Sequence, residues 1–355
     1  MPTSQYASSF GRLQAISLNL LSKETLQNLM KAKDESEMVK ILEPTWYGPE
    51  IEKAATLFKD ADLLEVALNR HLVQINKIAL EATPFNGKSA VRGYLSKWDI
   101  YNIELILSSK AMNRPITEVE SFLVSSRNVP AGVFAGNIPH DDIKVILSQN
   151  SVEGVVNQLV KYNYGTTLMQ NLESFQKTGD IGPMMYALQA NYYHSMLESL
   201  KFFQGDEGMI RALFRTEIDK KNILNLLKAK ESNLDKDLLS KHIIDGGFLS
   251  KSELLEIYGA KDIPEIVGRI ESRYMLINAL AQYKKSKSLI DFEVALDKFI
   301  NSEYVNKLKN IALSIGTIFY FILKMEQERE NIKRIAYGKR YNLSAEQVSS
   351  LLLIE

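Results

Sequence analysis

A helical motif occurs three times in this chain, and it limits the possible folds more than any other feature. Each copy places an acidic residue three positions before an asparagine, and a lysine eight positions after it. Its members are Trp98, Asp99, Asn102 and Lys110, then Asp219, Asn222 and Lys230, and finally Glu328, Asn331 and Lys339. The positions one, four and five after each asparagine are apolar and share one helical face. The pattern predicts three equivalent helices that end near Asn113, Asn233 and Gly338.

The acid and the asparagine lie on one helical face, so a catalytic pair is one interpretation of the motif. A threefold occurrence within an apolar stripe favours a structural role instead. The acid is expected to accept backbone N–H groups near the start of its helix. The asparagine is expected to bridge to the backbone of a neighbouring helix, and the lysine to suit the carbonyl end of its own helix. No catalytic, cofactor-binding or metal-binding residue is predicted.

Three further signatures repeat along the chain. Ala-Leu pairs precede the acids, with their leucines 31, 31 and 32 residues before them, at Leu68, Leu188 and Leu296. Helix starts with an apolar residue before the cap are predicted at Leu21–Ser22, Ile138–Pro139, Leu249–Ser250 and Leu343–Ser344. An aromatic turn follows each of the first three. The aromatic turns are Trp46–Gly48, Tyr162–Gly165 and Tyr274.

These spacings predict a tandem array of three helical lobes. The motif asparagines are 120 and 109 residues apart, which is enough for each unit to have its own core. The expected lobes are residues 1–120, residues 121–236, and residues 237–355 with a C-terminal helix. The start at Leu343–Ser344 is interpreted as a truncated fourth unit that docks on a neighbouring lobe.

Composition supports an all-α protein, because period-two alternation is scarce and long stretches have helical periodicity. The chain has 43 basic and 43 acidic side chains, so nucleic acid is not an expected partner. There is no cysteine, and the polar N-terminus favours a cytosolic chain. The apolar run at 311–323 has 13 residues and is expected to be a helix buried in protein, because a span needs about 20. The basic run at 284–287 is expected to be a solvated loop.

A search for catalytic motifs finds little. The sequence Asn86-Gly87-Lys88-Ser89 resembles the end of a phosphate-binding loop, but Ala82 stands where the first glycine is needed, and a helix rather than a strand is expected before it. A polar turn between helices is the favoured interpretation. The four histidines, His71, His140, His194 and His242, are too scattered to predict a metal site.

The three motif helices, together with Arg92-Gly93-Tyr94-Leu95 leading into Trp98-Asp99-Ile100, resemble the C subunit of archaeal-type and bacterial V-type rotary ATPases. The eukaryotic relative of that family is the d subunit of the vacuolar ATPase. The resemblance covers essentially the whole chain. It departs at Glu328 and at the Lys and Arg residues around the third motif, so the third lobe is where the geometry is expected to differ.

The resemblance implies an all-helical funnel of three pseudo-equivalent lobes without a catalytic centre or cofactor. It further implies one copy per complex, between the proteolipid rotor ring and the central shaft, at the cytoplasmic face of the membrane and held there by protein partners. The complex would couple protons or sodium ions to ATP synthesis or ion pumping. Two alternatives stay open: a helical adaptor of another complex, and an all-helical enzyme that uses the Gly87–Ser89 turn.

Overall fold

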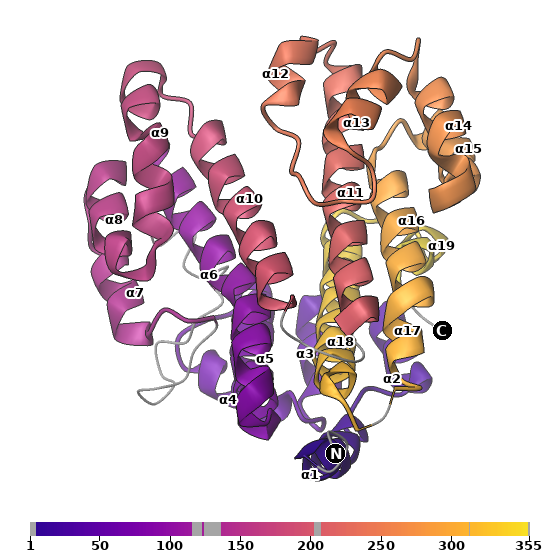
Figure 1. The fold of residues 1–355 in the computed structure, drawn as a ribbon. Helices are drawn as coiled ribbons and strands as arrows, with labels where there is room; N and C mark the ends of the chain where they lie inside the picture. The colour runs from indigo at the N-terminus through magenta and orange to yellow at the C-terminus, as the bar shows by residue number, and fades with distance from the viewer. Residues whose placement is uncertain (1–4, 116–122, 124–135, 202–206, 312, 354–355) are drawn as a thin grey trace. The chain divides into compact units, whose positions relative to one another are not determined.

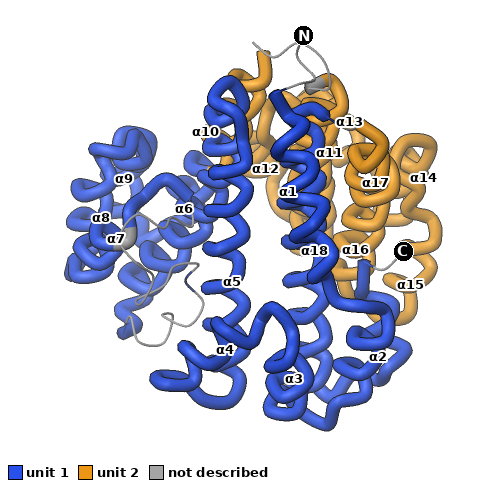
Figure 2. Tube along the Cα trace, turned by 90° about the horizontal axis from the view of Figure 1, so that it is seen from below, with its two compact units in different colours: residues 1–188, 313–354 blue, residues 189–312, 355 orange. Residues whose placement is uncertain are grey.

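In a computed structural model, the chain is described over residues 5–115, 123, 136–201, 207–311 and 313–353. These residues form helices joined by turns, and none of them lies in a strand, so the all-α prediction is confirmed (Figure 1). Contacts group the chain into two compact units. Unit 1 consists of residues 1–188 and 313–354, and unit 2 consists of residues 189–312 (Figure 2). The lobe boundaries at residues 120 and 236, and the funnel arrangement, stay predictions.

Unit 1 contains helices from both ends of the chain. They are α1 (Ala7–Ser17), α2 (Lys23–Lys31), α3 (Glu35–Leu42), α4 (Gly48–Ala55), α5 (Asp60–Ala82), α6 (Lys88–Ala111), α7 (His140–Leu147), α8 (Val152–Leu159), α9 (Tyr164–Thr178), α18 (Ile315–Arg340) and α19 (Ala345–Leu351). Short 3-10 turns at Phe85–Gly87 and Val160–Tyr162 precede α6 and α9.

Unit 2 begins within α10 (Gly182–Ser199), which crosses the boundary between the units. Its other helices are α11 (Glu207–Glu231), α12 (Lys236–Ser240), α13 (Lys251–Tyr258), α14 (Ile263–Tyr274), α15 (Ile277–Ser286), α16 (Ile290–Ile300) and α17 (Asn306–Leu308), with a π-helical turn at Asn301–Val305.

The cores of the two units follow the apolar stripes of the motif helices. In unit 1, Ile332 and Ile335 of α18 are fully buried against Leu29, Met38 and Tyr47 from the N-terminal helices. In unit 2, the apolar stripe of α11 is buried with residues of α13, α14 and α16 in one cluster. The three motif helices are α6, α11 and α18, as the spacing predicts.

All four predicted helix starts are present. Ser22 caps α2, Pro139 precedes α7, and Ser250 and Ser344 form complete capping boxes on α13 and α19. The apolar run at 311–323 enters α18 only at Ile315, and most of its helical residues are buried. Along the described residues, no helix has the length and apolar content needed to cross a bilayer. The basic run at 284–287 is exposed, but its first three residues are the last turn of α15 rather than a loop.

Candidate functional site

The first motif acid, Asp99, is completely buried in the middle of α6. Its carboxylate accepts the backbone N–H groups of Asn137 at 2.6 Å and Ile138 at 3.1 Å, and the hydroxyl of Tyr164 at 3.0 Å. The acid therefore connects its helix to the turn before α7 and to Tyr164, the first residue of α9. The prediction that the acid lies near the start of its own helix is wrong, because α6 begins at Lys88, three turns earlier.

The second acid, Asp219, repeats this arrangement on α11. It accepts the backbone N–H groups of Phe248 at 2.8 Å and Leu249 at 3.1 Å, and the hydroxyl of Tyr274. Asp219 is also completely buried and lies in the middle of its helix. The same two kinds of donor, a turn backbone before a capped helix and a tyrosine at the end of the aromatic segment, surround both acids.

The third acid, Glu328, takes its partners from the other end of the chain. It accepts the backbone N–H of Leu21 at 2.6 Å, the hydroxyl of Tyr47 at 2.9 Å and the indole N–H of Trp46 at 3.3 Å. Only one backbone donor remains, and the indole supplies the third hydrogen bond. The expected departure of the third copy is therefore local: one ligand of the carboxylate has changed, and the site is otherwise kept.

Glycines explain why aspartate serves in two copies and glutamate in the third. A Cβ on Gly136 would collide with the carboxylate of Asp99, and one on Gly247 would collide with that of Asp219. Both glycines let the turn backbone approach a short side chain closely. The corresponding residue before Leu21 is Asn19. Glutamate is one methylene longer, so it reaches a turn that cannot come as close.

Burial governs the protonation of these acids. It raises the pKa of Asp99 from 3.8 to about 6 and that of Glu328 from 4.5 to about 7, and it raises the pKa of Asp219 as well. The surrounding hydrogen bonds act in the opposite direction but are outweighed. Burial and the adjacent carboxylates also raise the pKa of the tyrosines Tyr47, Tyr164 and Tyr274, so their hydroxyls stay protonated and can donate.

The motif asparagines pair with single backbone units. Asn222 donates to the carbonyl of Ile244 at 2.8 Å and accepts its N–H at 2.9 Å. Asn331 does the same with Leu353, at 3.1 and 2.8 Å. Each partner is 22 residues further along the chain and lies in an irregular segment, whereas the sequence pattern predicts a neighbouring helix. Asn102 is equally buried, and the corresponding position 124 lies outside the described residues.

The motif lysines bind the ends of other helices rather than their own. Lys110 donates to the carbonyl of Leu147 at 3.1 Å, Lys230 to that of Tyr258 at 3.4 Å, and Lys339 to that of Met30. These carbonyls belong to the last turns of α7, α13 and α2. A cation at a helix C-terminus satisfies a carbonyl without an intrahelical partner and interacts favourably with the dipole. Each motif helix thus holds both ends of one short capped helix, with its acid and its lysine.

The three motif helices also end alike. Asn113, Asn233 and Asn342 have positive φ angles of 52°, 49° and 54°, and the next residue donates its N–H five residues back, as in a Schellman cap. The predicted end at Gly338 is therefore wrong, because α18 continues to Arg340. Gly338 is instead a packing position, since a Cβ there would collide with Val348 of α19.

The interpretation of Leu343–Ser344 as a fourth unit also needs correction. Leu343 lies 12 residues after its motif asparagine, as Leu234 does in the second copy. Helix α19 is thus the counterpart of α12, which completes a repeat rather than beginning one. Arg334 donates to the carbonyl of Leu351, and the Asn331 pair follows at Leu353, so α19 packs on the helix that precedes it.

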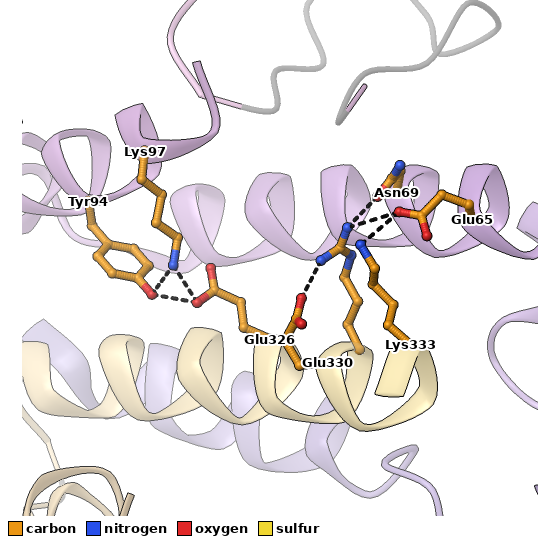
Figure 3. A network of polar contacts seen from close by, with 8 residues as sticks. Glu65, Asn69, Tyr94, Lys97, Glu326, Glu330 and Lys333 are labelled. Carbon is orange, nitrogen blue, oxygen red and sulfur yellow. Dashed lines mark hydrogen bonds and ion pairs between the residues drawn. The ribbon is translucent and has the colours of Figure 1, made fainter. Parts of the chain in front are cut away.

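A network of polar side chains lies between α18 and the helices α5 and α6 within unit 1 (Figure 3). Lys333 pairs with Glu65 at 2.8 Å, and Arg329 lies 3.8 Å from Glu65 and 2.8 Å from Glu330. Arg329 also donates to Asn69. The cations around the third motif are therefore partners of α5. In the sequence they are visible only as a departure from the family pattern, because nothing local indicates that Glu65 faces them.

A second group of polar side chains connects α6 to α18. Lys97 pairs with Glu326 at 2.6 Å, and both contact the hydroxyl of Tyr94 (Figure 3). The neighbouring Trp98 is half-buried against Leu72 and Val73, with the guanidinium of Arg329 5.4 Å from its ring. Trp98 therefore packs between α5 and α18.

The remaining candidates do not form a reaction centre. Gly87 ends a 3-10 turn and is covered by Thr83 and Tyr6, as expected for a turn between helices. Lys88 and Ser89 are instead the first two residues of α6, so the predicted turn is shorter than the Gly87–Ser89 segment. Burial lowers the pKa of His71 to about 3, and its ring packs on Trp46 and Tyr47. Among the residues that the structure describes, no three histidine or carboxylate side chains gather as a metal site would require.

Comparison with known proteins shows the family to which the chain is related. The model of the ATP synthase (C/AC39) subunit family matches residues 10–351. The chain belongs to this family. The C subunit of the A-type ATP synthase of Thermoplasma acidophilum is 35% identical over 352 residues, with 99% of each chain covered. The corresponding C subunits of Thermoplasma volcanium and Methanocaldococcus jannaschii are 33% and 27% identical, over 98% of this chain and 98% and 86% of their own.

Membership of the family confirms the resemblance inferred from the motif helices. It also confirms that the chain is not an enzyme, because the family is a non-catalytic stalk subunit of ATP synthase. The motif residues of this C/AC39 chain are then best understood as the ties that hold short capped helices to long ones. That role stays a prediction for experiment.

Proposed function

We propose that this chain is the coupling subunit between the proteolipid rotor ring and the central shaft of an A-type or V-type rotary ATPase. One copy per complex would be held at the cytoplasmic face of the membrane by protein contacts. The complex would use protons or sodium ions in ATP synthesis or pumping. The observation that carries the proposal is the match to the ATP synthase C/AC39 family across residues 10–351.

The hydrogen bonds that the motif side chains make to neighbouring segments support this function. A part that transmits torque has to resist bending, and closely packed helices provide stiffness. Around Asp219 and its motif, one helix is bonded to two turn N–H groups, to a tyrosine hydroxyl, to both backbone groups of Ile244 and to a carbonyl of α13. Six hydrogen bonds from three side chains of one helix fix the short helices against it.

The attachment to the membrane is expected to depend on partners. Since no described helix is long and apolar enough to cross a bilayer, the chain is proposed to bind through the proteins of the ring. Charged contacts of that kind weaken as salt screens them, whereas apolar contacts persist. A partial release from membranes at high salt is therefore expected.

The test is to fractionate cells that lack the ring protein and to ask where the chain is found. It should leave the membrane fraction, and it should co-purify with ring and shaft when both are present. Continued membrane association without the ring, or co-purification with an unrelated assembly, would favour the adaptor interpretation. Ion-driven ATP synthesis by membranes lacking the chain should fall to background and return when the purified chain is added.

A further inference from the structure

Unit 2 contains a solvent-open cavity of about 420 Å³ beside α11. One wall is formed by His194 at the C-terminal end of α10 and by Lys201 just after this helix. Arg211 and Arg215 of α11 form another wall, and the turn at Asp245 closes a third side. This volume lies within the range of small-ligand sites. None of the roles assigned to the motif residues uses the cavity.

The two arginines of the cavity have no acidic partner among the described residues. Arg211 donates to the carbonyl of Leu200 at 2.8 Å, and Arg215 donates to the carbonyls of Gly246 and Gly247 at 3.3 and 2.8 Å. All three acceptors are neutral. By contrast, Lys201 forms an ion pair with Glu198 at 2.5 Å. The lining therefore carries an excess of positive charge, which Asp245 only partly offsets.

One guanidinium nitrogen at the cavity has an unmet hydrogen-bonding requirement. The Nε atom of Arg211 is buried and has no hydrogen-bond partner among the residues that the structure describes. A buried N–H without an acceptor is unfavourable. An arginine presents its N–H groups as a planar fork, which fits the oxygens of phosphate or carboxylate groups. An oxyanion in the cavity would supply the negative charge that this lining lacks.

Comparison of the three motif helices shows that the repeat does not need these arginines for packing. Arg211 and Arg215 stand eight and four residues before Asp219. The matching positions are Val91 and Leu95 in the first copy, and Tyr320 and Lys324 in the third. The basic pair is thus a property of the second copy alone, although the acid site beside it is shared by all three.

We propose that this cavity binds a phosphate-sized oxyanion between Arg211 and Arg215, with Lys201 at the rim. The shared chemistry is a compact group with several anionic oxygens, either inorganic phosphate or the phosphate of a small organic molecule. Arg211 supplies a guanidinium group whose charge is not balanced by an acidic partner among the described residues. Arg215 contributes charge while it holds the turn backbone at Gly246 and Gly247.

Phosphorus NMR on the purified full chain tests the proposal with inorganic phosphate as the probe, at ionic strength held constant with chloride. Line broadening should saturate with a Kd of roughly millimolar. Arg211→Gln should weaken binding at least about tenfold, since a hydrogen bond to a charged group is lost. Arg211→Lys should fall between the two. The matched control is Arg269→Gln, which makes the same charge change on exposed α14 and should leave binding unchanged.

Thermal melts accompany each variant, so that loss of fold is not mistaken for loss of binding. If Arg211→Gln unfolds, Lys201→Gln replaces it, because that side chain is exposed and should also weaken binding. Adenosine monophosphate forms the second arm: tighter binding than phosphate identifies a phosphate ester as the source, and weaker binding identifies free phosphate. Broadening that does not saturate, or that is equal in the parent, Arg211→Gln and Lys201→Gln, would overturn the assignment.

Discussion

The replacement Asn222→Leu removes both hydrogen bonds to Ile244 while nearly conserving side-chain volume. Asn222 is 1% exposed and Ile244 is 2% exposed, so water cannot replace the lost partner. A buried backbone N–H and a buried C=O are then left unsatisfied. Each such group costs about 1–3 kcal/mol, and some relaxation of the irregular segment is expected. The free energy of unfolding should fall by about 2–4 kcal/mol.

The matched control is Asn225→Leu, one turn further along α11. Asn225 is half-buried, and its side chain makes no hydrogen bond within the described part of the chain. Its replacement should change the free energy of unfolding by no more than about 0.5 kcal/mol. Denaturant unfolding compares the two variants, and hydrogen exchange follows the amide of Ile244, which should exchange faster only in Asn222→Leu. Equal stability of both variants and unchanged exchange at Ile244 would refute the structural role of the motif asparagine.

Three further expectations concern the other ties. Because the pKa of Glu328 is raised from 4.5 to about 7, the folded state holds its proton more tightly, so the contribution of this carboxyl group to stability should be fully present below pH 4.5 and should fall by up to about 3 kcal/mol towards pH 7; denaturant midpoints for Glu328→Gln should lack that part of the pH dependence, and identical pH profiles would contradict it. Gly247→Ala should destabilise by more than about 1 kcal/mol through collision with a carboxylate, whereas Gly268→Ala, on an exposed helix face with open space, should stabilise by about 0.5–1 kcal/mol, as thermal melts can show. Lys110→Met should lower the melting temperature by an amount equivalent to about 0.5–1.5 kcal/mol, and a melting temperature equal to the parent's would argue against the carbonyl tie.

The sequence predicts the motif helices well because the ties are made by recurring side chains. Asp99, Asn102 and Lys110 can be aligned with later copies by spacing alone. Their partners cannot, since the N–H of Ile138 or the carbonyl of Leu147 is a backbone group that any residue type would supply. The position of the acids in mid-helix cannot be predicted for the same reason: an aspartate that accepts foreign N–H groups has no local sign that distinguishes it from a helix cap.

Contacts between residues far apart in the sequence are harder to predict from a sequence pattern. The pairing of Glu65 with Arg329 and Lys333 joins residues more than 260 positions apart, and the periodicity of α5 alone predicts only that one face is buried. The helix end at Asn342 is detectable in the sequence, because Asn113 and Asn233 occupy the same offset in the other copies. Gly338 is the more familiar helix stop signal, and it leads to the wrong prediction of the end of α18.

The dependence of Glu328 on Leu21 and Tyr47 has a consequence for synthesis on the ribosome. Leu21 and Tyr47 emerge early, but the acid that accepts their hydrogen bonds is 307 and 281 positions later. At about 5–20 residues per second, these N-terminal helices wait tens of seconds for α18. The segment 189–312 is inserted between the two halves of unit 1 and emerges from the ribosome before α18 does. Unit 2 is therefore expected to be the first to finish folding, with its Asp219 site formed while the N-terminal helices of unit 1 still lack their acid.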